Sequence, residues 1–363
     1  MKVTGIICEY NPFHNGHLYH INKAKELTNP DVLVCALSGN YNQRGDISII
    51  DKFEKTKAAL NNGVDLVVEI PYIYVTQNAY QFANAGVNIL KQLKANYLVF
   101  GSETNNMEEL NKYASLEIDV TRLKELMHTG ESYPSVYGLL AGSLYPNDIL
   151  AVAYLRALKG SNIEPIAIQR TNEYLSNDLD IIASASAIRN GIKQNKDVSM
   201  ATPLKIENPH YNEDLYPYLR NLLFTMSKKD LQDIFLVSEG IENMLVDNAI
   251  KYSDYEDFIN HNVSRRYTRS RIQRILLQIM NQIKKEDVLN LKPQNYVRVL
   301  GFNEKGQQLL KQLKDEANIV TLFKNIPSQY KDIEWKTSLI YSSILNNQEE
   351  YLVNELKGPI IIK

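Results

Sequence analysis

Short apolar runs alternate with amphipathic stretches through the first half of the chain. Apolar runs of strand length lie at 3–8, 31–38, 64–71, 96–103 and 165–170. Several of these runs are separated by stretches with apolar residues at every third or fourth position, as on one face of a helix. Strands that are joined by helices pair in parallel, because the crossover returns the chain to the same end of the sheet. The alternation therefore predicts an α/β fold with a parallel sheet.

The alternation stops after about residue 195, where helical periodicity takes over. Pro203 and the polar run 207–210 follow this change and mark the start of a second domain. We therefore predict a parallel α/β domain over residues 1–195 and a mainly helical domain over residues 196–363.

The first apolar run continues directly into a turn and a predicted helix start, within residues 5–20. The dipeptide 11–12 is a turn signal, and Gly16 lacks the side chain that would keep a phosphate away from the backbone. A helix that begins near His17 would direct free N–H groups and its positive dipole end at the same anion. His14 and His17 would add two side-chain donors, so this stretch predicts a phosphate site.

Two other interpretations of these histidines stay open from the residues alone. A transition-metal site would also need carboxylate, cysteine or further histidine ligands, and the chain has only six histidines. Single motifs of this length also arise by chance in ordinary loops. We predict no metal site.

Further polar residues follow the carboxyl ends of predicted strands, where open parallel sheets bind their ligands. The loop 38–46 is polar and contains Arg44, an anion partner, while Gly101 would let a base or ribose approach the backbone. Arg170 ends the last predicted strand and is placed to reach the same ligand. A surface turn and solvated arginines are the alternative interpretation.

A second candidate phosphate site lies at 183–189, where small hydroxyl residues precede an arginine. At a helix start, Ser184 or Ser186 would cap free N–H groups, and Ser186 and Arg189 would share one face. This arrangement suits the outer phosphates of a nucleotide. The alternative is an ordinary helix cap with a surface arginine.

The helical half contains a basic segment, residues 261–285, which has two lysines and no Asp or Glu. Its five arginines are Arg265, Arg266, Arg269, Arg271 and Arg274. Apolar residues along one face predict that the helix docks on the protein, with its basic end and Tyr267 outward. Such charge is often only a solvated surface. Beside a nucleotide site, we interpret it as an RNA-backbone contact.

Composition indicates an ordinary globular protein, with 44% apolar and 23% charged residues among 363 and a formal net charge of −2. Cys8 and Cys35 lie in apolar runs and are expected to be buried free thiols. No apolar run approaches the roughly 18 residues of a membrane span, and the chain starts directly in a strand without a targeting segment. We expect a cytoplasmic protein without a membrane partner, of open oligomeric state.

Two motifs resemble those of a known superfamily. Residues 14–17 match the HxGH signature of the nucleotidyltransferase superfamily that also includes class I aminoacyl-tRNA synthetases. Residues 183–189 resemble its SSTxIR motif, with Ala185 and Ser186 in place of the usual Ser and Thr. The two motifs occur in the expected order, which strengthens the resemblance.

Longer strings at 8–17 and 38–46 closely resemble the bacterial tRNA(Met) cytidine acetate ligase family. The resemblance is strong over the first domain and looser over 265–274 and 296–302. It implies a parallel-sheet Rossmann-like nucleotidyltransferase domain that binds ATP, followed by a mainly helical domain that binds tRNA.

The resemblance also implies a reaction in two steps. Acetate and ATP, with Mg²⁺, would give acetyl-adenylate and pyrophosphate, and the acetyl group would pass to N4 of the wobble cytidine of elongator tRNA(Met). No residue is an obvious general base for that amine. The implied catalytic residues are His14 and His17, and the five arginines would bind RNA. The implied ATP-binding residues are Ile7, Cys8, Glu9, Tyr10, Asn11, Pro12, Phe13, His14, Asn15, Gly16, His17, Leu18, Tyr19, His20, Gly101, Asn147, Arg170, Ser184, Ser186 and Arg189.

Two other functions remain possible from the sequence. A small-molecule adenylyltransferase would share both motifs but would need no basic helical domain. A non-catalytic nucleotide-sensing or RNA-binding module would retain the glycines but would not need both His14 and His17.

Overall fold

The computed structural model describes residues 1–116, 144–170, 179 and 181–363. Eight strands form one sheet in the order β5-β4-β1-β2-β3-β6-β7, and β8 pairs with β6. Strands β1 to β5 pair in parallel, whereas β6 runs antiparallel to β3. The strands are β1 Val3–Cys8, β2 Val32–Ser38, β3 Leu66–Ile70, β4 Tyr97–Ser102, β5 Glu164–Gln169, β6 Val297–Phe302, β7 Ile319–Val320 and β8 Ile360–Ile361.

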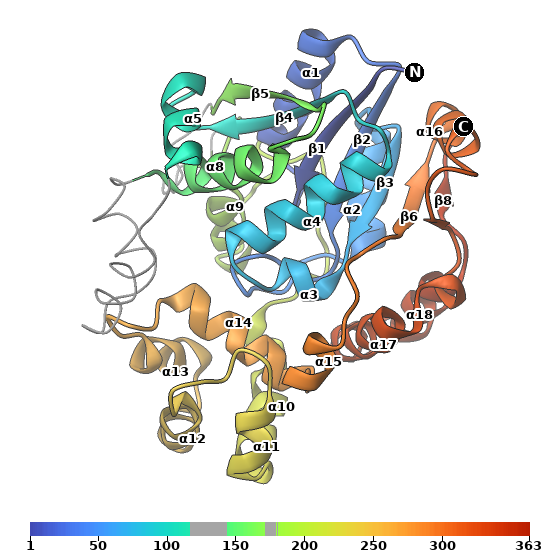
Figure 1. The fold of residues 1–363 in the computed structure, drawn as a ribbon. Coiled ribbons are helices and arrows are strands. Elements are labelled where there is room, and N and C mark those ends of the chain that lie inside the picture. Colours follow the sequence, from blue (N-terminus) through green and yellow to red (C-terminus); the bar gives the residue numbers. More distant parts are fainter. Residues whose placement is uncertain (117–143, 171–178, 180) are drawn as a thin grey trace.

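Helices cover both faces of this sheet (Figure 1). Alternate residues of the strands point to opposite faces, so Val32 and Val34 pack with α4 and α8 while Leu33 and Cys35 pack with α1 and α2. In the first half the helices are α1 Asn15–Thr28, α2 Lys52–Asn61, α3 Tyr72–Val75, α4 Ala79–Gln92, α5 Met107–Ser115, α8 Pro146–Leu158 and α9 Ala185–Lys193. The α/β fold and its parallel sheet are therefore confirmed. The sequence also predicts a charged helical stretch at 107–130, without identifiable chemistry, and most of it lies outside the described residues.

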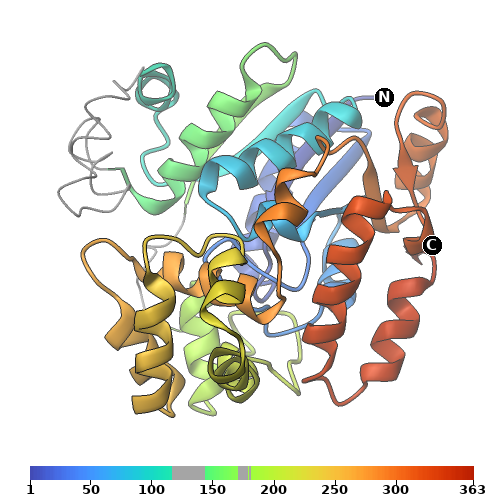
Figure 2. The ribbon, with the colours of Figure 1, turned by 60° about the horizontal axis from the view of Figure 1, so that its bottom comes forward.

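The chain after α9 is mainly helical. Its helices are α10 Asn212–Thr225, α11 Lys228–Asp233, α12 Ile241–Lys251, α13 Tyr255–Asn262, α14 Arg269–Met280, α15 Lys285–Leu289, α16 Glu304–Gln312, α17 Ser328–Ser342 and α18 Gln348–Leu356, with a 3₁₀ turn at Phe323–Asn325. Figures 1 and 2 show α10 to α14 gathered at one end of the sheet, with α17 and α18 beside them. No described helix has the length and apolar character needed to cross a membrane.

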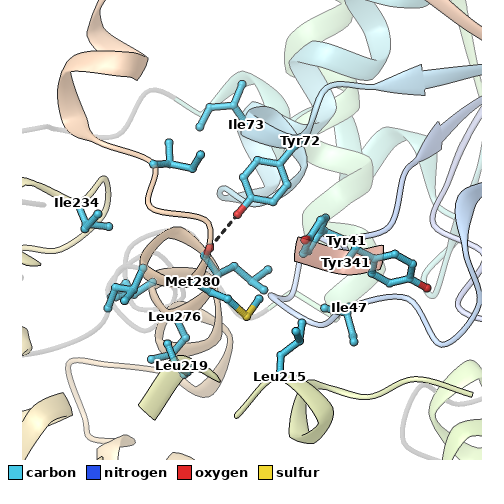
Figure 3. Close-up of a cluster of buried hydrophobic side chains, with 14 of the residues drawn as sticks. Tyr41, Ile47, Tyr72, Ile73, Leu215, Leu219, Ile234, Leu276, Met280 and Tyr341 are labelled. Atoms are coloured by element: carbon cyan, nitrogen blue, oxygen red, sulfur yellow. Dashed lines mark hydrogen bonds between the residues drawn. The ribbon is translucent and has the colours of Figure 1, made fainter. Parts of the chain in front are cut away.

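One apolar cluster joins these helices to the loops at the carboxyl ends of the strands (Figure 3). Tyr41 from the loop after β2 and Tyr72 from α3 pack edge to face, with ring centres 4.8 Å apart. The Tyr72 hydroxyl donates to the carbonyl of Leu277 in α14 at 3.2 Å. The helical part is thus packed directly against the loops that surround the predicted ligand site, while the division at residue 195 stays a prediction.

Candidate nucleotide-binding site

The α1 N-terminus fixes both motif histidines through their Nδ1 atoms. His14 is the N-cap, and its Nδ1 accepts the Gly16 N–H at 3.0 Å. The Nδ1 of His17 accepts the His14 N–H at 3.2 Å, and the two ring centres are 3.8 Å apart. A neutral imidazole with Nδ1 as acceptor carries its proton on Nε2. Each ring therefore presents one N–H donor through its Nε2 atom.

Both histidines are neutral in the folded protein. Burial, together with the nearby charges of Arg170 and Arg189, lowers the pKa of His14 to about 3. Burial also lowers the pKa of His17 well below its usual value, with His14 a further cause. Neutral rings of this tautomer can donate a hydrogen bond to an anion, and Arg170 and Arg189 place positive charge beside them.

A cavity of about 240 Å³ lies at the carboxyl ends of the first strands, beside this helix start. The implied ATP-binding residues line it except for Pro12, Phe13, Asn15 and Leu18. Phe13 is instead buried in the core, and the Asn15 amide donates to the Met200 carbonyl at 2.8 Å. Phe13 and Asn15 therefore anchor the loop to the rest of the protein and do not line the cavity. Cys8 and Cys35 are buried free thiols, as expected.

The second motif reaches the same cavity from α9. Ser184 caps this helix, because its hydroxyl accepts the Ala187 N–H at 3.1 Å. The hydroxyls of Ser184 and Ser186 are 3.1 Å apart. Arg189, one turn on, donates from Nη1 to the Asn11 carbonyl at 2.7 Å. The structure thus brings together two motifs that are about 170 residues apart in the sequence.

Arg170 and Gly101 meet at the ends of β5 and β4. A Cβ atom at position 101 would lie 3.3 Å from the Arg170 Cγ, closer than most real contacts of this kind. Glycine therefore leaves room for the arginine side chain to lie across the end of β4. Both residues line the cavity, as the sequence predicted.

Two acidic residues that sequence reasoning missed position Asn147 at the start of α8. The Glu103 carboxylate accepts the N–H groups of Asn147 at 3.0 Å and Asp148 at 3.1 Å. The Asp148 carboxylate in turn accepts the Glu103 N–H at 3.0 Å. An acidic residue in the first helical turn is a capping signal that points to Asp148, but its partner 45 residues away is not readable from the sequence.

The loop after β2 is held by Glu9, which also lines the cavity. Its Oε1 accepts the Gln43 N–H at 2.6 Å, and burial raises the pKa of its carboxyl. Lys55, a buried residue of α2, donates to the Glu9 carbonyl at 2.8 Å and to the Ser38 carbonyl at 2.9 Å. Burial lowers the pKa of Lys55 to about 7. This lysine was also missed, because charge normally indicates an exposed position.

The basic segment is only partly a surface. Arg265 is exposed, the Arg266 side chain is 41% exposed, and Arg269 pairs with Glu256 at 2.6 Å. The expectation that Tyr267 faces outward is wrong, because its ring is buried beneath the Arg271 guanidinium, 4.5 Å away.

Arg274 also departs from the expected outward orientation. Its Nη1 donates to the Gln43 carbonyl at 3.1 Å, so it contacts the loop after β2. Burial, with the charges of Arg271 and Arg44, lowers the pKa of Arg274 to about 10. Arg274 does not face outward because it lies one turn after Arg271 on α14, on the side of the helix that packs against the loop after β2.

Comparisons with known proteins agree with this geometry. Residues 1–355 match the family model described as HIGH Nucleotidyl Transferase. A protein of Oceanobacillus iheyensis named tRNA(Met) cytidine acetate ligase is 36% identical, with both chains fully covered. One of Clostridium kluyveri with the same name is 37% identical over all of this chain and 99% of its own.

Two solved structures of Thermotoga maritima TmcAL also match over their full length. The apo form has a TM-score of 0.90 at 31% identity. The form bound with alpha-thio ATP has a TM-score of 0.88 at 30% identity. The chain therefore belongs to the HIGH nucleotidyl transferases and, within them, to the family of the tRNA(Met) cytidine acetate ligases.

Proposed function

We propose that this protein activates acetate with ATP and transfers the acetyl group to N4 of the wobble cytidine of elongator tRNA(Met). The observation that carries the proposal is the convergence of His14, His17, Arg170 and Arg189 on one cavity, with both histidines held as Nε2–H donors. The names of the relatives and the ATP-analogue complex of a neighbour support it. A cytoplasmic location, where ATP and tRNA occur together, belongs to the same proposal.

In the first step an acetate oxygen attacks the α-phosphorus of ATP, and pyrophosphate leaves. Negative charge grows on the phosphate oxygens in the transition state, where fixed donors stabilise it most. The Nε2–H groups of His14 and His17 suit the α-phosphate. Arg189 and the α9 N-terminus suit the leaving pyrophosphate.

Mg²⁺ belongs to the proposal as an ion that enters with ATP. Among the described residues, no group of three His, Cys, Asp or Glu side chains is arranged to hold a metal. Magnesium is commonly bound by substrate phosphates and few protein ligands. It would supply neutralisation of the triphosphate charge.

In the second step the exocyclic amine of cytidine attacks the acetyl carbonyl carbon of the adenylate. A bond forms between N4 and this carbon, the bond to the phosphate oxygen breaks, and AMP leaves with the electron pair. The proton on N4 can pass to the phosphate of the departing AMP. The protein then has to hold the RNA so that N4 reaches the acetyl carbonyl. We assign this role to Arg265, Arg266 and Arg269 of the basic segment.

Supplying each acyl donor separately tests the proposal. Purified protein is incubated with elongator tRNA(Met) and either ATP plus labelled acetate or labelled acetyl-coenzyme A alone. We expect label in RNA only with ATP and acetate, together with pyrophosphate release. Label from acetyl-coenzyme A alone would overturn the adenylate mechanism. AMP transfer to a phosphorylated small molecule would indicate an adenylyltransferase instead.

A further inference from the structure

A second cavity, of about 470 Å³, lies on the helical side of the loop after β2. Its walls come from α14, α15 and the segment 235–238, and we call it the outer pocket. The Phe235 N–H donates to the Ile283 carbonyl at 2.8 Å, which holds this segment against the connection between α14 and α15. This hydrogen bond fixes one wall of the outer pocket in place.

Gln43 links the outer pocket to the nucleotide-binding cavity. Gln43 lines the nucleotide-binding cavity, whereas Gln77 and Arg274 line the outer pocket. The Gln43 side chain donates to the Gln77 carbonyl at 3.1 Å, and the Gln43 carbonyl accepts from Arg274 at 3.1 Å. A ligand that fills the nucleotide-binding cavity and extends past Gln43 would therefore enter the outer pocket.

The outer pocket combines apolar walls with positive charge. Phe235, Leu236 and Leu289 contribute apolar surface, and Leu289 is 84% exposed, the most of any large apolar side chain in the described chain. Arg271 and Arg274 line it as well.

Lys285 is the third cation, and no acidic residue is among the described residues of the lining. The Lys285 ammonium donates to the Gln232 carbonyl, a neutral partner that leaves its charge in place. Glu239, which lies outside the lining, is 3.6 Å from Arg271. The pocket therefore keeps a net positive charge, which is complementary to a phosphate.

This combination fits a nucleotide of single-stranded RNA. Unstacked bases bind on apolar and aromatic side chains, and their phosphates bind Lys and Arg. The Gln77 amide nitrogen donates to the Ile73 carbonyl and the Asn78 oxygen accepts the Gln81 N–H, so the Gln77 oxygen and the Asn78 amide nitrogen are the atoms that can meet a base edge. A cytosine amine can reach an adenylate only after leaving its stack, and the backbone then holds the adjacent nucleotide close to the same site.

We propose that the outer pocket binds the unstacked base and phosphate of a nucleotide next to the modified cytidine. The proposal rests on the proposed function and adds a site that selects the RNA. In this arrangement the modified cytidine lies in the nucleotide-binding cavity, the adjacent nucleotide lies in the outer pocket, and Gln43 lies between them.

Leu289→Glu tests the pocket, because this exposed side chain can be replaced without disturbing the core. Leu356→Glu is the matched control, since Leu356 is 54% exposed on α18 and is not among the residues that line the outer pocket. Affinity is measured for intact elongator tRNA(Met) and for tRNA made abasic at either neighbour of the wobble cytidine. We expect Leu289→Glu to weaken binding of intact tRNA about tenfold, as base-stacking losses do, and Leu356→Glu to leave it unchanged.

The abasic tRNAs complete a double-mutant cycle. Removal of the base at one of the two neighbouring positions should weaken the binding of tRNA to the wild type about tenfold. The same change should have little further effect on tRNA binding by the Leu289→Glu variant. Wild-type affinity in Leu289→Glu, or full additivity of the two changes, would overturn the pocket. Absence of acetyl transfer by the wild type would instead overturn the proposed function, so the two failures are distinguishable.

Discussion

At the scale of single residues, the proposed chemistry depends on which ring nitrogen of each histidine carries its proton. Backbone N–H groups occupy the Nδ1 atoms of His14 and His17, so the Nε2 atoms are the donors. The spacing of the two residues predicts that they lie together at a helix start. The tautomer depends on the backbone geometry of the turn and could not be inferred from the sequence.

Replacing His14 separates its capping role from its proposed catalytic role. We expect His14→Ala and His17→Ala each to lower acetate-dependent pyrophosphate release about a hundredfold, roughly 2.7 kcal/mol of transition-state stabilisation. His14→Asn keeps a side-chain oxygen for the Gly16 N–H but lacks the Nε2 donor. It should lose the same activity while retaining the roughly 1 kcal/mol of capping that Ala removes. Wild-type rates in these variants would contradict the site assignment.

The lowered pKa of His14 predicts a pH-dependent stability. Above pH 6.5 the ring is neutral in both folded and unfolded protein, and between pH 6.5 and about 3 only the unfolded chain binds the proton. The free energy of unfolding therefore decreases as the pH is lowered from 6.5 to about 3. Urea unfolding at pH 7 and pH 5 should show wild type losing about 2 kcal/mol more than His14→Asn. Equal losses in the two proteins would mean that His14 is not buried as a neutral ring.

At the scale of elements, hydrophobic periodicity was sufficient for the strands of the first half and for its longer helices, but it did not indicate the single turn of α3. The predicted run 3–8 is the strand Val3–Cys8, and the predicted helix start at 183–189 is α9 with Ser184 as its cap. Periodicity describes only which face of an element is covered. It could not show that Arg274 meets the Gln43 carbonyl, because that contact joins residues 231 positions apart.

The position of each arginine along the basic segment predicts what its reversal does. Arg265→Glu, Arg266→Glu and Arg269→Glu should weaken tRNA binding, and each should flatten the salt dependence by about one unit of slope. Their RNA-free pyrophosphate release should stay close to wild type. Arg274→Glu should lower that release as well, because it loses the contact that holds Gln43.

The control for this series is Lys314→Glu, a charge reversal at an exposed site after α16. It should bind tRNA like the wild type. If affinity and salt slope stay unchanged throughout the arginine series, the basic segment is only a solvated surface and RNA docks elsewhere.

At the scale of the whole molecule, a buried ion cluster joins the C-terminal helices to the sheet. Lys52 of α2 lies 2.9 Å from Glu69 of β3 and 2.8 Å from Glu355 of α18. Arg298 of β6 contacts the same two carboxylates at 2.6 and 3.1 Å. The return of β6 to the sheet, antiparallel to β3, could not be predicted, because pairing between such distant segments leaves no local pattern.

Removing one charge from this cluster should destabilise the protein strongly. Burial acts to raise the pKa of Glu355, but Arg298 and Lys52 lower it to about 2, so it is ionised at neutral pH. Glu355→Gln leaves two buried cations with the Glu69 carboxylate and the carboxyl of Glu334, whose pKa burial raises to about 8, at a cost of about 3 kcal/mol in free energy of unfolding. Glu349→Gln, at an exposed position on the same helix, is the control and should change little. If urea unfolding gives the same free energy of unfolding for Glu355→Gln as for the wild type, the structural role of the cluster is contradicted.

The measurement that tests the central claim most directly is the identity of the product nucleoside. Purified protein is incubated with ATP, labelled acetate and total bacterial tRNA, and the RNA is then digested to nucleosides. The proposed function predicts labelled N4-acetylcytidine from the wobble position of elongator tRNA(Met), and almost none with His14→Asn. Label absent from RNA, or present in a different nucleoside, would contradict it.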